Sequence, residues 1–454
     1  MLGIAGVIIK LTELIIVDRV IRGVVKMDVQ LAYGKKGLTL QLDDAWNVSV
    51  VEPLYTPGVT DARGALKEAL RNPTGTKPLR ELVTGSDRVG IIFNDITRAT
   101  PNQIILPAIL AELEHVPPEK IVLFNALGTH RPNTEDELRQ MLGDSIVNTY
   151  RIVQNNAFDR STQVYLGMTS LGHEIWINRE LATCDFRILT GFIEPHFFAG
   201  YSGGGKAIMP GMAGLDTILG NHSARNIGNP RAIWGVTHGN PIWEEIREVA
   251  LKTGADFLVN VTLNREKAIT AVFTGELDQA HEKGCEFVRR TAMAPVDEPF
   301  DIVVTSNSGY PLDLNLYQTV KGMSAAAQIV REGGAIIIAS ECWDGIPDHG
   351  LFGQLLRESA TPEELLSRIN QPGFSKQDQW QAQVLGMVLL KAEVYVHSDY
   401  LSEDQLIQAM LQPALSIEET IRVLLDRYGK QARICILPEG PVTIPYIRQT
   451  ARVV

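Results

Sequence analysis

Short runs of Val, Ile and Leu alternate along the chain with segments in which apolar residues recur at helical spacing. Residues 88–95 and 120–125 are two such runs, and residues 104–115 between them have the spacing of a helix. Thr134 and Glu137 have the spacing of a capping box, which predicts that another helix begins there. Continuous apolar strands are typical of parallel sheets covered by helices. The pattern predicts an α/β fold with parallel-type sheets flanked by helices, in which ligands bind at the carboxyl ends of the strands.

The length of the chain predicts two domains, because 454 residues exceed one ordinary domain. A polar, proline-containing segment at residues 291–299 precedes a new alternation of apolar runs and helical segments. We place the boundary there and expect an N-terminal α/β domain at residues 27–294 and a C-terminal α/β domain at residues 295–437. Residues 438–454 form a tail. One arrangement open to this tail is packing back on the N-terminal domain. We expect the ligand site in the interdomain cleft.

Residues 1–26 are rich in Ile, Val and Leu, as a signal sequence or a membrane span would be. Charged residues such as Lys10, Glu13 and Asp18 interrupt the apolar run. No stretch reaches the ~18 uninterrupted apolar residues of a membrane span, and no small-residue cleavage site follows. We therefore treat this segment as an N-terminal extension of uncertain role, and either Met1 or Met27 is the natural start.

The net charge and the cysteine spacing limit the kinds of partner that the protein can bind. The chain has 53 acidic and 42 basic residues, a net charge of −11 that offers no attraction to nucleic acid or to an anionic membrane. Its four cysteines lie far apart without a C-x-x-C pair, so they predict neither a zinc cluster nor a disulfide framework. These features predict a cytoplasmic globular protein with a small-molecule partner, and a homo-oligomer remains an open alternative.

A glycine-rich loop at residues 200–206 ends in Lys206 and matches the phosphate-loop pattern G-x-x-x-x-G-K. Ala207 stands where magnesium coordination requires Ser or Thr, and Pro210 follows almost at once. A nucleotide-hydrolysing loop is therefore disfavoured. The remaining interpretation is a lysine on a loop whose backbone can approach a bulky ligand closely.

Three of the nine histidines stand beside Gly or Pro in loops that follow apolar runs. They are His130, His196 and His222. Imidazole titrates near neutral pH and also binds nickel, zinc or copper, so the three can divide acid/base and metal-ligand roles. For the remaining histidines in apolar or helical surroundings, an ordinary surface or core position is the simpler interpretation.

The segment Asp95-Ile96-Thr97-Arg98 directly follows an apolar run, so its side chains are expected at the carboxyl edge of the sheet. The forked guanidinium of Arg98 suits a carboxylate or a phosphate.

After the apolar run at residues 302–305, Gln318 and Lys321 lie one helical turn apart on one face. A solvated helix face is the alternative for this pair. Tyr310 and Trp343 are candidates to line a pocket, with ordinary packing as the alternative.

Five motifs taken together carry a resemblance to a known family. They are D-x-T-R at residues 95–98, G-T-H-R-P at residues 128–132, E-P-H-F-F-A-G-Y-S-G-G-G-K at residues 194–206, N-H at residues 221–222 and Q-x-x-K at residues 318–321. In this order they make the chain, from about Met27 to the C-terminus, resemble the nickel-dependent lactate racemase family. One departure is that Ala99 and Thr100 separate Arg98 from Pro101, where many relatives have proline directly after the arginine.

The resemblance implies a cofactor, the nickel pincer nucleotide. This group is a pyridinium mononucleotide whose nickel is held by two sulfurs, a ring carbon and a histidine. By resemblance, Lys206 is its covalent tether and His222 the protein ligand to nickel. Asp95, Ile96, Thr97 and Arg98 would hold the cofactor, which makes residues 27–294 the cofactor-binding domain. Dedicated maturation enzymes that make the group are implied as partners.

The resemblance also implies an activity, racemisation or 2-epimerisation of a 2-hydroxy carboxylic acid by reversible hydride transfer to the cofactor. His130 and His196 would be the acid/base pair. Gln318, Lys321 and Tyr310 would bind the substrate from the second domain. Lactate-like, malate-like and sugar acids remain open as substrates, because no motif separates them.

Three alternatives use the same residues. A zinc metallohydrolase would use His130, His196 and His222 as ligands, without an organic cofactor. A non-catalytic cofactor carrier would not need the acid/base pair. A pyridoxal phosphate enzyme would use Lys206 as a Schiff base.

Overall fold

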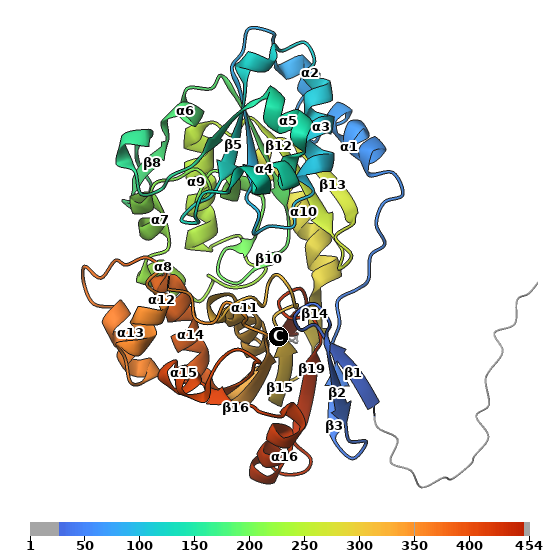
Figure 1. Cartoon of the computed structure of the whole chain (residues 1–454), viewed down its shortest axis with the longest axis vertical. Helices are drawn as coiled ribbons and strands as arrows, with labels where there is room; N and C mark the ends of the chain where they lie inside the picture. Colours follow the sequence, from blue (N-terminus) through green and yellow to red (C-terminus); the bar gives the residue numbers. More distant parts are fainter. Residues whose placement is uncertain (1–26, 349, 449–454) are drawn as a thin grey trace, which may run out of the picture.

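The computed structural model describes residues 27–348 and 350–448, which form two α/β halves along the long axis of the molecule (Figure 1). Each half is built around one six-stranded sheet. The predicted fold class, parallel-type sheets flanked by helices, is confirmed. The predictions made for residues 1–26, and for residues 449–454 of the tail, lie outside the described residues.

The first sheet has the strand order β13-β12-β9-β4-β5-β6, and every neighbouring pair is parallel except β12 and β13. Its strands are β4 (Val89–Asn94), β5 (Ile121–Ala126), β6 (Arg151–Gln154), β9 (Phe186–Phe192), β12 (Phe257–Leu263) and β13 (Ile269–Gly275). The apolar runs at residues 88–95 and 120–125 are therefore adjacent parallel strands, as predicted.

Helices cover both faces of this sheet, because successive side chains of each strand point to opposite sides. Ile91 and Phe93 pack in one core, and Ile92 packs in the other. The first face carries α1 (Ala62–Arg71), α2 (Leu79–Leu82), α3 (Asn102–Glu112), α4 (Glu135–Leu142) and α5 (Asp144–Thr149). The second carries α6 (Arg179–Ala182), α7 (Leu215–Asn221), α8 (Ala224–Ile227), α9 (Pro241–Thr253) and α10 (Leu277–Ala292). The capping box of Thr134 and Glu137 begins α4, as predicted.

The second sheet has the order β18-β17-β16-β15-β19-β3 and is parallel throughout. Its strands are β3 (Asn47–Val50), β15 (Phe300–Ser306), β16 (Val330–Ala339), β17 (Ala392–His397), β18 (Gln412–Pro413) and β19 (Arg433–Leu437). One face packs against α11 (Leu316–Ala327), α12 (Phe352–Arg357), α13 (Pro362–Ile369), α14 (Gln379–Lys391) and α15 (Glu403–Gln408). The other packs against α16 (Ile417–Tyr428) and the hairpin of β1 (Met27–Leu31) and β2 (Leu38–Leu42).

The N-terminal strands correct the predicted domain limits. Residues 27–50 were assigned to the first domain, but β3 pairs with β19 of the second sheet. Leu31, Leu40 and Leu42 are buried in the core of the second half. The physical reason is that the hairpin covers an apolar face of the second sheet that α16 leaves open.

The tail pairs with the segment that joins the two halves. β20 (Ile444–Ile447) lies parallel to β14 (Met293–Val296), which follows α10 directly and spans the predicted boundary at residue 294. The remaining described elements are β7 (Gln163–Met168), β8 (Glu174–Asn178), β10 (Pro195–His196), β11 (Gly200–Tyr201) and short 3-10 helices at Pro118–Lys120, Arg160–Thr162 and Gly204–Ala207.

The two halves share one hydrophobic core. Trp234 of the first half donates a hydrogen bond from Nε1 to Ser324 Oγ of the second at 3.1 Å. Gln383 Nε2 donates to the carbonyl of Ala224 at 2.8 Å. These contacts fix one half against the other beside the ligand site.

The order of strands reverses once in each sheet. In the first sheet the chain proceeds outward in both directions from the neighbours β4 and β9. In the second it proceeds outward from β15 to β18 and then returns to β19, which lies between β15 and the edge strand β3. Ligands of open α/β sheets bind at the carboxyl ends of strands at such reversals. The segments that follow β4, β9 and β15 carry most of the predicted site residues.

Two further sequence predictions concern composition. All four cysteines, Cys184, Cys285, Cys342 and Cys435, are buried and free. Within residues 27–348 and 350–448, no helix has the length and apolar character needed to cross a membrane.

Candidate active site

Two adjoining cavities lie between the halves. The first, of about 150 Å³, is called the site cavity. The second, of about 220 Å³, is called the side cavity. Arg98, Phe192, Glu194 and Lys321 line both cavities and so form the neck between them.

The site cavity brings together most of the predicted site residues. The first half contributes Asp95, Arg98, His130, His196, Lys206 and His222. The second contributes Gln318 and Lys321. Thr97 lines the side cavity, and Ile96 lines neither.

His130 follows β5 and is held by the carboxylate of Asp95, which follows β4. The distance from His130 Nδ1 to Asp95 Oδ2 is 2.7 Å, and Thr97 Oγ1 donates a hydrogen bond to Asp95 Oδ1 at 2.8 Å. Burial raises the pKa of Asp95, but the hydrogen bond and charge of His130, with Arg98 and Thr97, outweigh it and leave that pKa below its usual value. An ionised carboxylate only accepts hydrogen bonds, so His130 donates from Nδ1. In its neutral form the ring therefore offers an unprotonated Nε2.

His196 has the opposite arrangement of its ring nitrogens. It lies in β10, and its Nδ1 accepts hydrogen bonds from the backbone N–H groups of Ala199 at 3.2 Å and Phe198 at 3.5 Å. Burial, and then the charges of Lys206, Lys321 and Arg98, hold the pKa of His196 well below its usual 6.5. The ring is therefore neutral and carries its proton on Nε2.

Lys206 is presented by the glycine loop that follows β11. Gly203 and Gly204 have φ values of 73° and 56°, in the left-handed region that favours glycine. Asn260 Oδ1 accepts a hydrogen bond from the Gly204 N–H at 2.8 Å, and a Cβ at Gly203 would lie 2.4 Å from that oxygen. Behind the loop, His281 Nε2 lies 2.9 Å from the carbonyl of Ser202. The loop is thus held on one side by protein and leaves Lys206 facing the cavity.

The amine of Lys206 is buried, and its Nζ lies 5.8 Å from the ring centroid of Phe198. Burial, with the charges of Arg98 and Lys321, lowers the pKa of Lys206 to about 7. A substantial fraction of the amine is therefore neutral near pH 7, which is the nucleophilic form.

His222 directly follows α7 and is enclosed by aromatic rings. Its ring lies edge-on to Phe198 at 4.9 Å and to Trp380 at 5.1 Å between centroids. Burial, followed by the charge of Lys206, lowers the pKa of His222 to about 3. Among the described residues, no group hydrogen-bonds to its buried Nδ1. A neutral imidazole with a free nitrogen is a competent ligand for a transition metal.

A metal at this position would need most of its ligands from elsewhere. Within the described ranges, no group of three or more His, Cys, Asp or Glu side chains is arranged to hold a metal ion. The unpaired Nδ1 of His222 therefore suits a metal that is carried by a cofactor with donor atoms of its own.

The second half closes the site with α11 and α14. Gln318 and Lys321 lie on α11, whose first turn is capped by Asn315. Burial and the charge of Arg98 lower the pKa of Lys321 to about 7, although Glu194 opposes this. Trp380 Nε1 donates to Tyr317 Oη at 3.0 Å, which fixes both rings in the wall.

Several wall residues were not predicted as site residues. Glu194 belongs to a quoted motif, but no role was assigned to it. Burial raises the pKa of its carboxyl, and the charges of Arg98, Lys321, Lys267 and Lys206 oppose this. Tyr317 directly precedes Gln318, and this position next to a predicted site residue could have identified Tyr317 as a wall residue. Trp380 and Gln381 come from α14, and no sequence signal points to them.

Tyr310 corrects the sequence interpretation. It lines neither cavity and its side chain is 48% exposed. Its backbone N–H donates to the carbonyl of Gly34, and Lys35 Nζ lies 4.5 Å from the centre of its ring. The turn after β15 therefore directs Tyr310 to the β1–β2 hairpin. Trp343, 49% exposed, also lies outside both cavities.

Comparison with known proteins gives matches over both halves. Residues 33–235 match the lactate racemase N-terminal domain, and residues 296–444 match the lactate racemase C-terminal domain. A lactate racemase of Thermoanaerobacterium thermosaccharolyticum is 34% identical over 91% of this chain and 98% of its own length. A lactate racemase of Lactiplantibacillus plantarum is 35% identical over 91% of this chain and 98% of its own length.

Solved structures agree with these matches. The lactate racemase apoprotein from Thermoanaerobacterium thermosaccharolyticum superimposes with a TM-score of 0.87 at 33% identity, covering 92% of this chain and 100% of that one. A protein of Thermotoga maritima shares the fold, with a TM-score of 0.66 at 19% identity over 87% of this chain and 100% of its own. From the two domain matches and the identity over nearly the whole length, the chain belongs to the lactate racemase family of isomerases.

Proposed function

We propose that the protein racemises or epimerises a 2-hydroxy carboxylic acid at C2, by reversible hydride transfer with a nickel pincer nucleotide attached to Lys206. The observation that carries this proposal is that His130 and His196 line one cavity with Lys206 and His222, and that Nδ1 of His130 faces a carboxylate whereas Nδ1 of His196 accepts from backbone N–H groups. Inversion at C2 requires a group that takes the hydroxyl proton and a group that stabilises the carbonyl oxygen.

The residues present fit the cofactor. Lys206 offers a partly neutral amine in the wall of the site cavity. His222 offers a neutral ring whose buried Nδ1 makes no hydrogen bond to the described residues. Arg98 provides a forked cation at the wall of the same cavity. When bound, the cofactor supplies a reversible acceptor for the hydrogen on C2, whose acidity is too low for direct removal by histidine.

His130 is the base in the resting arrangement. With Nδ1 donating to Asp95, the neutral form of the ring has an unprotonated Nε2, which accepts the hydroxyl proton of the substrate. The carboxylate of Asp95 then stabilises the imidazolium that forms and keeps the ring oriented. Asp95 thus serves as the positioning residue for His130, in addition to the contact with the cofactor that the family resemblance implies.

His196 begins as a hydrogen-bond donor. Its Nε2 carries the proton, so it donates to the oxygen on C2 and stabilises the carbonyl as it forms. The proton taken up by His130 returns to the oxygen on C2 when the hydrogen returns to the other face of C2, which completes the inversion. The opposite enantiomer reacts by the same steps in reverse.

The second half binds the carboxylate of the substrate. Lys321 and Gln318 lie on one face of α11, and Arg98 faces them from the first half. A carboxylate between Arg98 and Lys321 would also compensate the two cations that lower the pKa of Lys206. Tyr310, which lies outside both cavities, is not assigned to substrate binding.

The test is to mature the protein with the cofactor-producing enzymes and nickel, verify the Lys206 adduct by intact mass, and follow the optical rotation of D-2-hydroxy acids. Racemisation or epimerisation that is lost in Lys206→Ala and in His130→Ala, but kept in the exposed control Lys283→Ala, supports the proposal. A verified adduct without turnover of any acid favours a cofactor carrier. Zinc-dependent hydrolysis without an adduct favours the metallohydrolase, and an aldimine absorption band favours pyridoxal phosphate.

A cytoplasmic location, a requirement for maturation enzymes and a homo-oligomeric assembly stay predictions. The first is tested by fractionation of the native host, the second by expression with and without the maturation enzymes, and the third by light scattering of the purified protein.

A further inference from the structure

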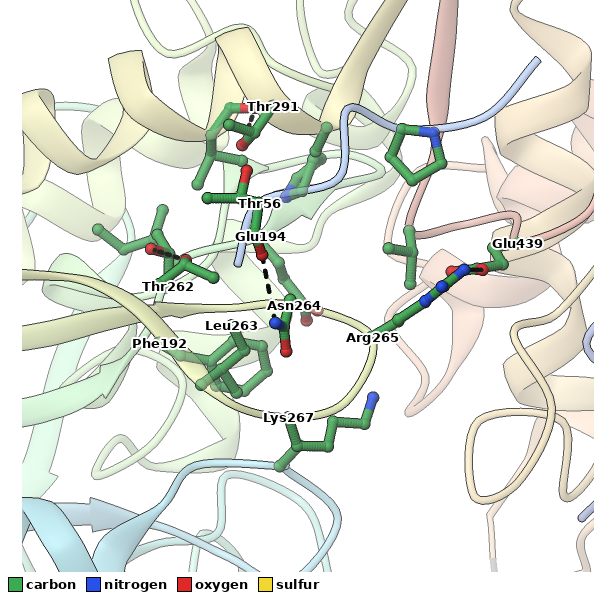
Figure 2. A pocket seen from close by; sticks show the side chains of 18 of the residues that line it. Thr56, Phe192, Glu194, Thr262, Leu263, Asn264, Arg265, Lys267, Thr291 and Glu439 are labelled. Carbon is green, nitrogen blue, oxygen red and sulfur yellow. Dashed lines mark hydrogen bonds and ion pairs between the residues drawn. The ribbon is translucent and has the colours of Figure 1, made fainter. Parts of the chain in front are cut away.

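The side cavity lies outside the proposed chemistry, and its walls combine apolar side chains with charges of both signs. Figure 2 shows Arg265 beside Glu439, with 3.8 Å between their closest nitrogen and oxygen atoms, and Lys267 in the same turn between β12 and β13. These charges favour no single class of ligand. A more specific feature is the buried carboxyl group of Glu245, which contacts the residue before His222.

Glu245 lies on α9 and is 2% exposed, although it lines neither cavity. Burial of such a group costs free energy unless hydrogen bonds replace those made to water. Thr169 Oγ1 donates to its Oε1, and His173 Nδ1 lies 2.7 Å from the same oxygen. Asn221 Nδ2 donates to its Oε2 at 2.8 Å. Within the described part of the chain, no Lys or Arg forms an ion pair with this group, so hydrogen bonds compensate its burial.

Asn221 is the last residue of α7 and directly precedes His222. It is 1% exposed and binds α9 at two points, because Nδ2 donates both to Glu245 and to the carbonyl of Ile242, the latter at 3.1 Å. Its own carbonyl accepts from Asn226 Nδ2 at 3.0 Å. The end of α7 is therefore fixed to α9, which lies beside it (Figure 1).

His173 packs against the same end of α7. A Cβ at Gly220 would lie 2.7 Å from Cγ of the His173 ring, so the glycine allows this close approach. Because His173 also contacts Glu245, the carboxyl group, the imidazole and the last turn of α7 form one connected cluster. His222 directly follows this cluster in the chain, and its ring lines the site cavity.

We propose that Glu245 is a positioning residue for His222, because through Asn221 it fixes the end of α7 and so the place of the imidazole in the site cavity. This inference rests on the proposed function and adds a residue to the support of the nickel ligand. Groups that orient a metal ligand without binding the metal typically contribute about 10–100-fold to metal affinity or activity. Since Glu245 acts through a neighbouring residue, we expect an effect of about tenfold, at the lower end of this range.

The experiment measures the rate of nickel loss to EDTA from the matured protein, with the Lys206 adduct verified by intact mass. Glu245→Leu removes both acceptor oxygens and should release nickel about tenfold faster than the unaltered protein. Glu245→Gln retains an acceptor for Asn221, so its rate should stay within about threefold of that of the unaltered protein. His222→Ala removes the proposed ligand and sets the upper limit of the rate.

Asn221→Ala removes the donor of the same contact and decides the question if Glu245→Leu does not fold. It should also release nickel about tenfold faster. The double variant should lose nickel no faster than either single variant, because both changes break one contact. Glu112→Leu is the matched control, since Glu112 is also 2% exposed but pairs with Arg71 and Arg80 on α3, which covers the opposite face of the first sheet. It should lower the Tm without changing the rate of nickel loss.

The outcomes separate this inference from the proposed function. Turnover of a 2-hydroxy acid, with an unchanged rate of nickel loss in Glu245→Leu and Asn221→Ala, overturns the inference and leaves the proposed function standing. Additive effects in the double variant, or an equal effect of Glu112→Leu, also overturn it. Faster loss in both single variants, with rescue by Glu245→Gln, establishes it, even where no acid is turned over. A protein that takes up neither adduct nor nickel after maturation, or that loses nickel no faster as His222→Ala, overturns both.

Discussion

The two halves of the protein have the same architecture but supply different kinds of side chain to the site. Each has a six-stranded sheet whose strand order reverses once. In the first half, loops follow β4, β5 and β9, and they place Asp95, His130, His196 and Lys206 individually. In the second half, α11 follows β15 and presents Gln318 and Lys321 at the fixed spacing of a helix. A loop can orient each side chain independently toward a reacting centre, whereas a helix holds its side chains at one fixed spacing.

This difference suggests a division of work. Under the proposed function the first half determines where protons lie, because Nδ1 of His130 faces Asp95 and Nδ1 of His196 accepts from backbone N–H groups. The second half contributes a cation and an amide that suit a carboxylate. Substitutions in the first half should therefore lower kcat, and substitutions in the second should mainly raise KM.

The largest expected effect is that of Asp95→Asn. The amide can donate to His130 Nδ1, which moves the ring proton to Nε2 and removes the base. We expect kcat of the matured enzyme to fall about 10³–10⁴-fold, as for a catalytic histidine held in the wrong tautomer. Asp136→Asn, an exposed carboxylate in the first turn of α4, is the control and should change kcat less than about twofold. Asp95→Asn with full adduct and normal kcat would remove the assigned role of Asp95.

Replacing each of the two histidines with glutamine tests whether His130 acts as a base and His196 as a hydrogen-bond donor. Glutamine retains an N–H donor but no basic nitrogen, so it replaces a donor better than a base. His130→Gln should lower kcat about 10²–10⁴-fold, and His196→Gln should retain about tenfold more activity. Equal losses, measured by optical rotation, would contradict the tautomer assignment.

Lys321→Met tests the role of the second half. Loss of a charged hydrogen bond to the carboxylate should raise KM roughly 10–100-fold, with kcat within about threefold of the unaltered enzyme. The control is Lys283→Met, an exposed lysine on α10. A fall in kcat at unchanged KM would mean that Lys321 takes part in the chemistry, and the division between the halves would be lost.

The fold was largely predictable because buried parallel strands have a local signature. Residues 88–95 and 120–125 are apolar on both faces, and they are β4 and β5 of the first sheet. β3 was not predictable by the same logic. Its four residues, Asn-Val-Ser-Val, lie at a sheet edge and are mostly exposed, so their sequence shows no burial on either face. β3 joins its sheet by pairing with β19, which lies almost 400 residues later in the chain.

Part of the site was predictable because residues that directly follow parallel strands meet at one edge of the sheet. That rule finds Asp95 and His130. It fails for Trp380, whose position depends on the packing of α14, and for Tyr310, which the turn after β15 directs to another surface. The position of the ring proton on His196 could not be predicted from the sequence either, because the hydrogen bonds to this ring come from backbone groups and not from a recognisable side chain.

The smallest expected effect concerns the two buried lysines, one from each half. Lys206 and Lys321 both have a pKa lowered to about 7 from the usual 10.5 by burial. Between pH 7 and 10.5 the unfolded chain binds a proton that the folded chain does not, so the free energy of unfolding rises with pH across that window. Below pH 7 the cost of each buried charge is fully present.

Replacing either lysine with methionine removes this cost. Lys206→Met and Lys321→Met should therefore each raise the Tm of the apoprotein at pH 7, on the order of 5 °C, and this advantage should shrink as the pH approaches 10.5. Thermal unfolding at pH 7, 8.5 and 10 measures it, with Lys283→Met as the exposed control. An advantage independent of pH would indicate apolar packing rather than relief of a buried charge. An advantage for one lysine alone would mean that the two halves do not enclose the cavity equally.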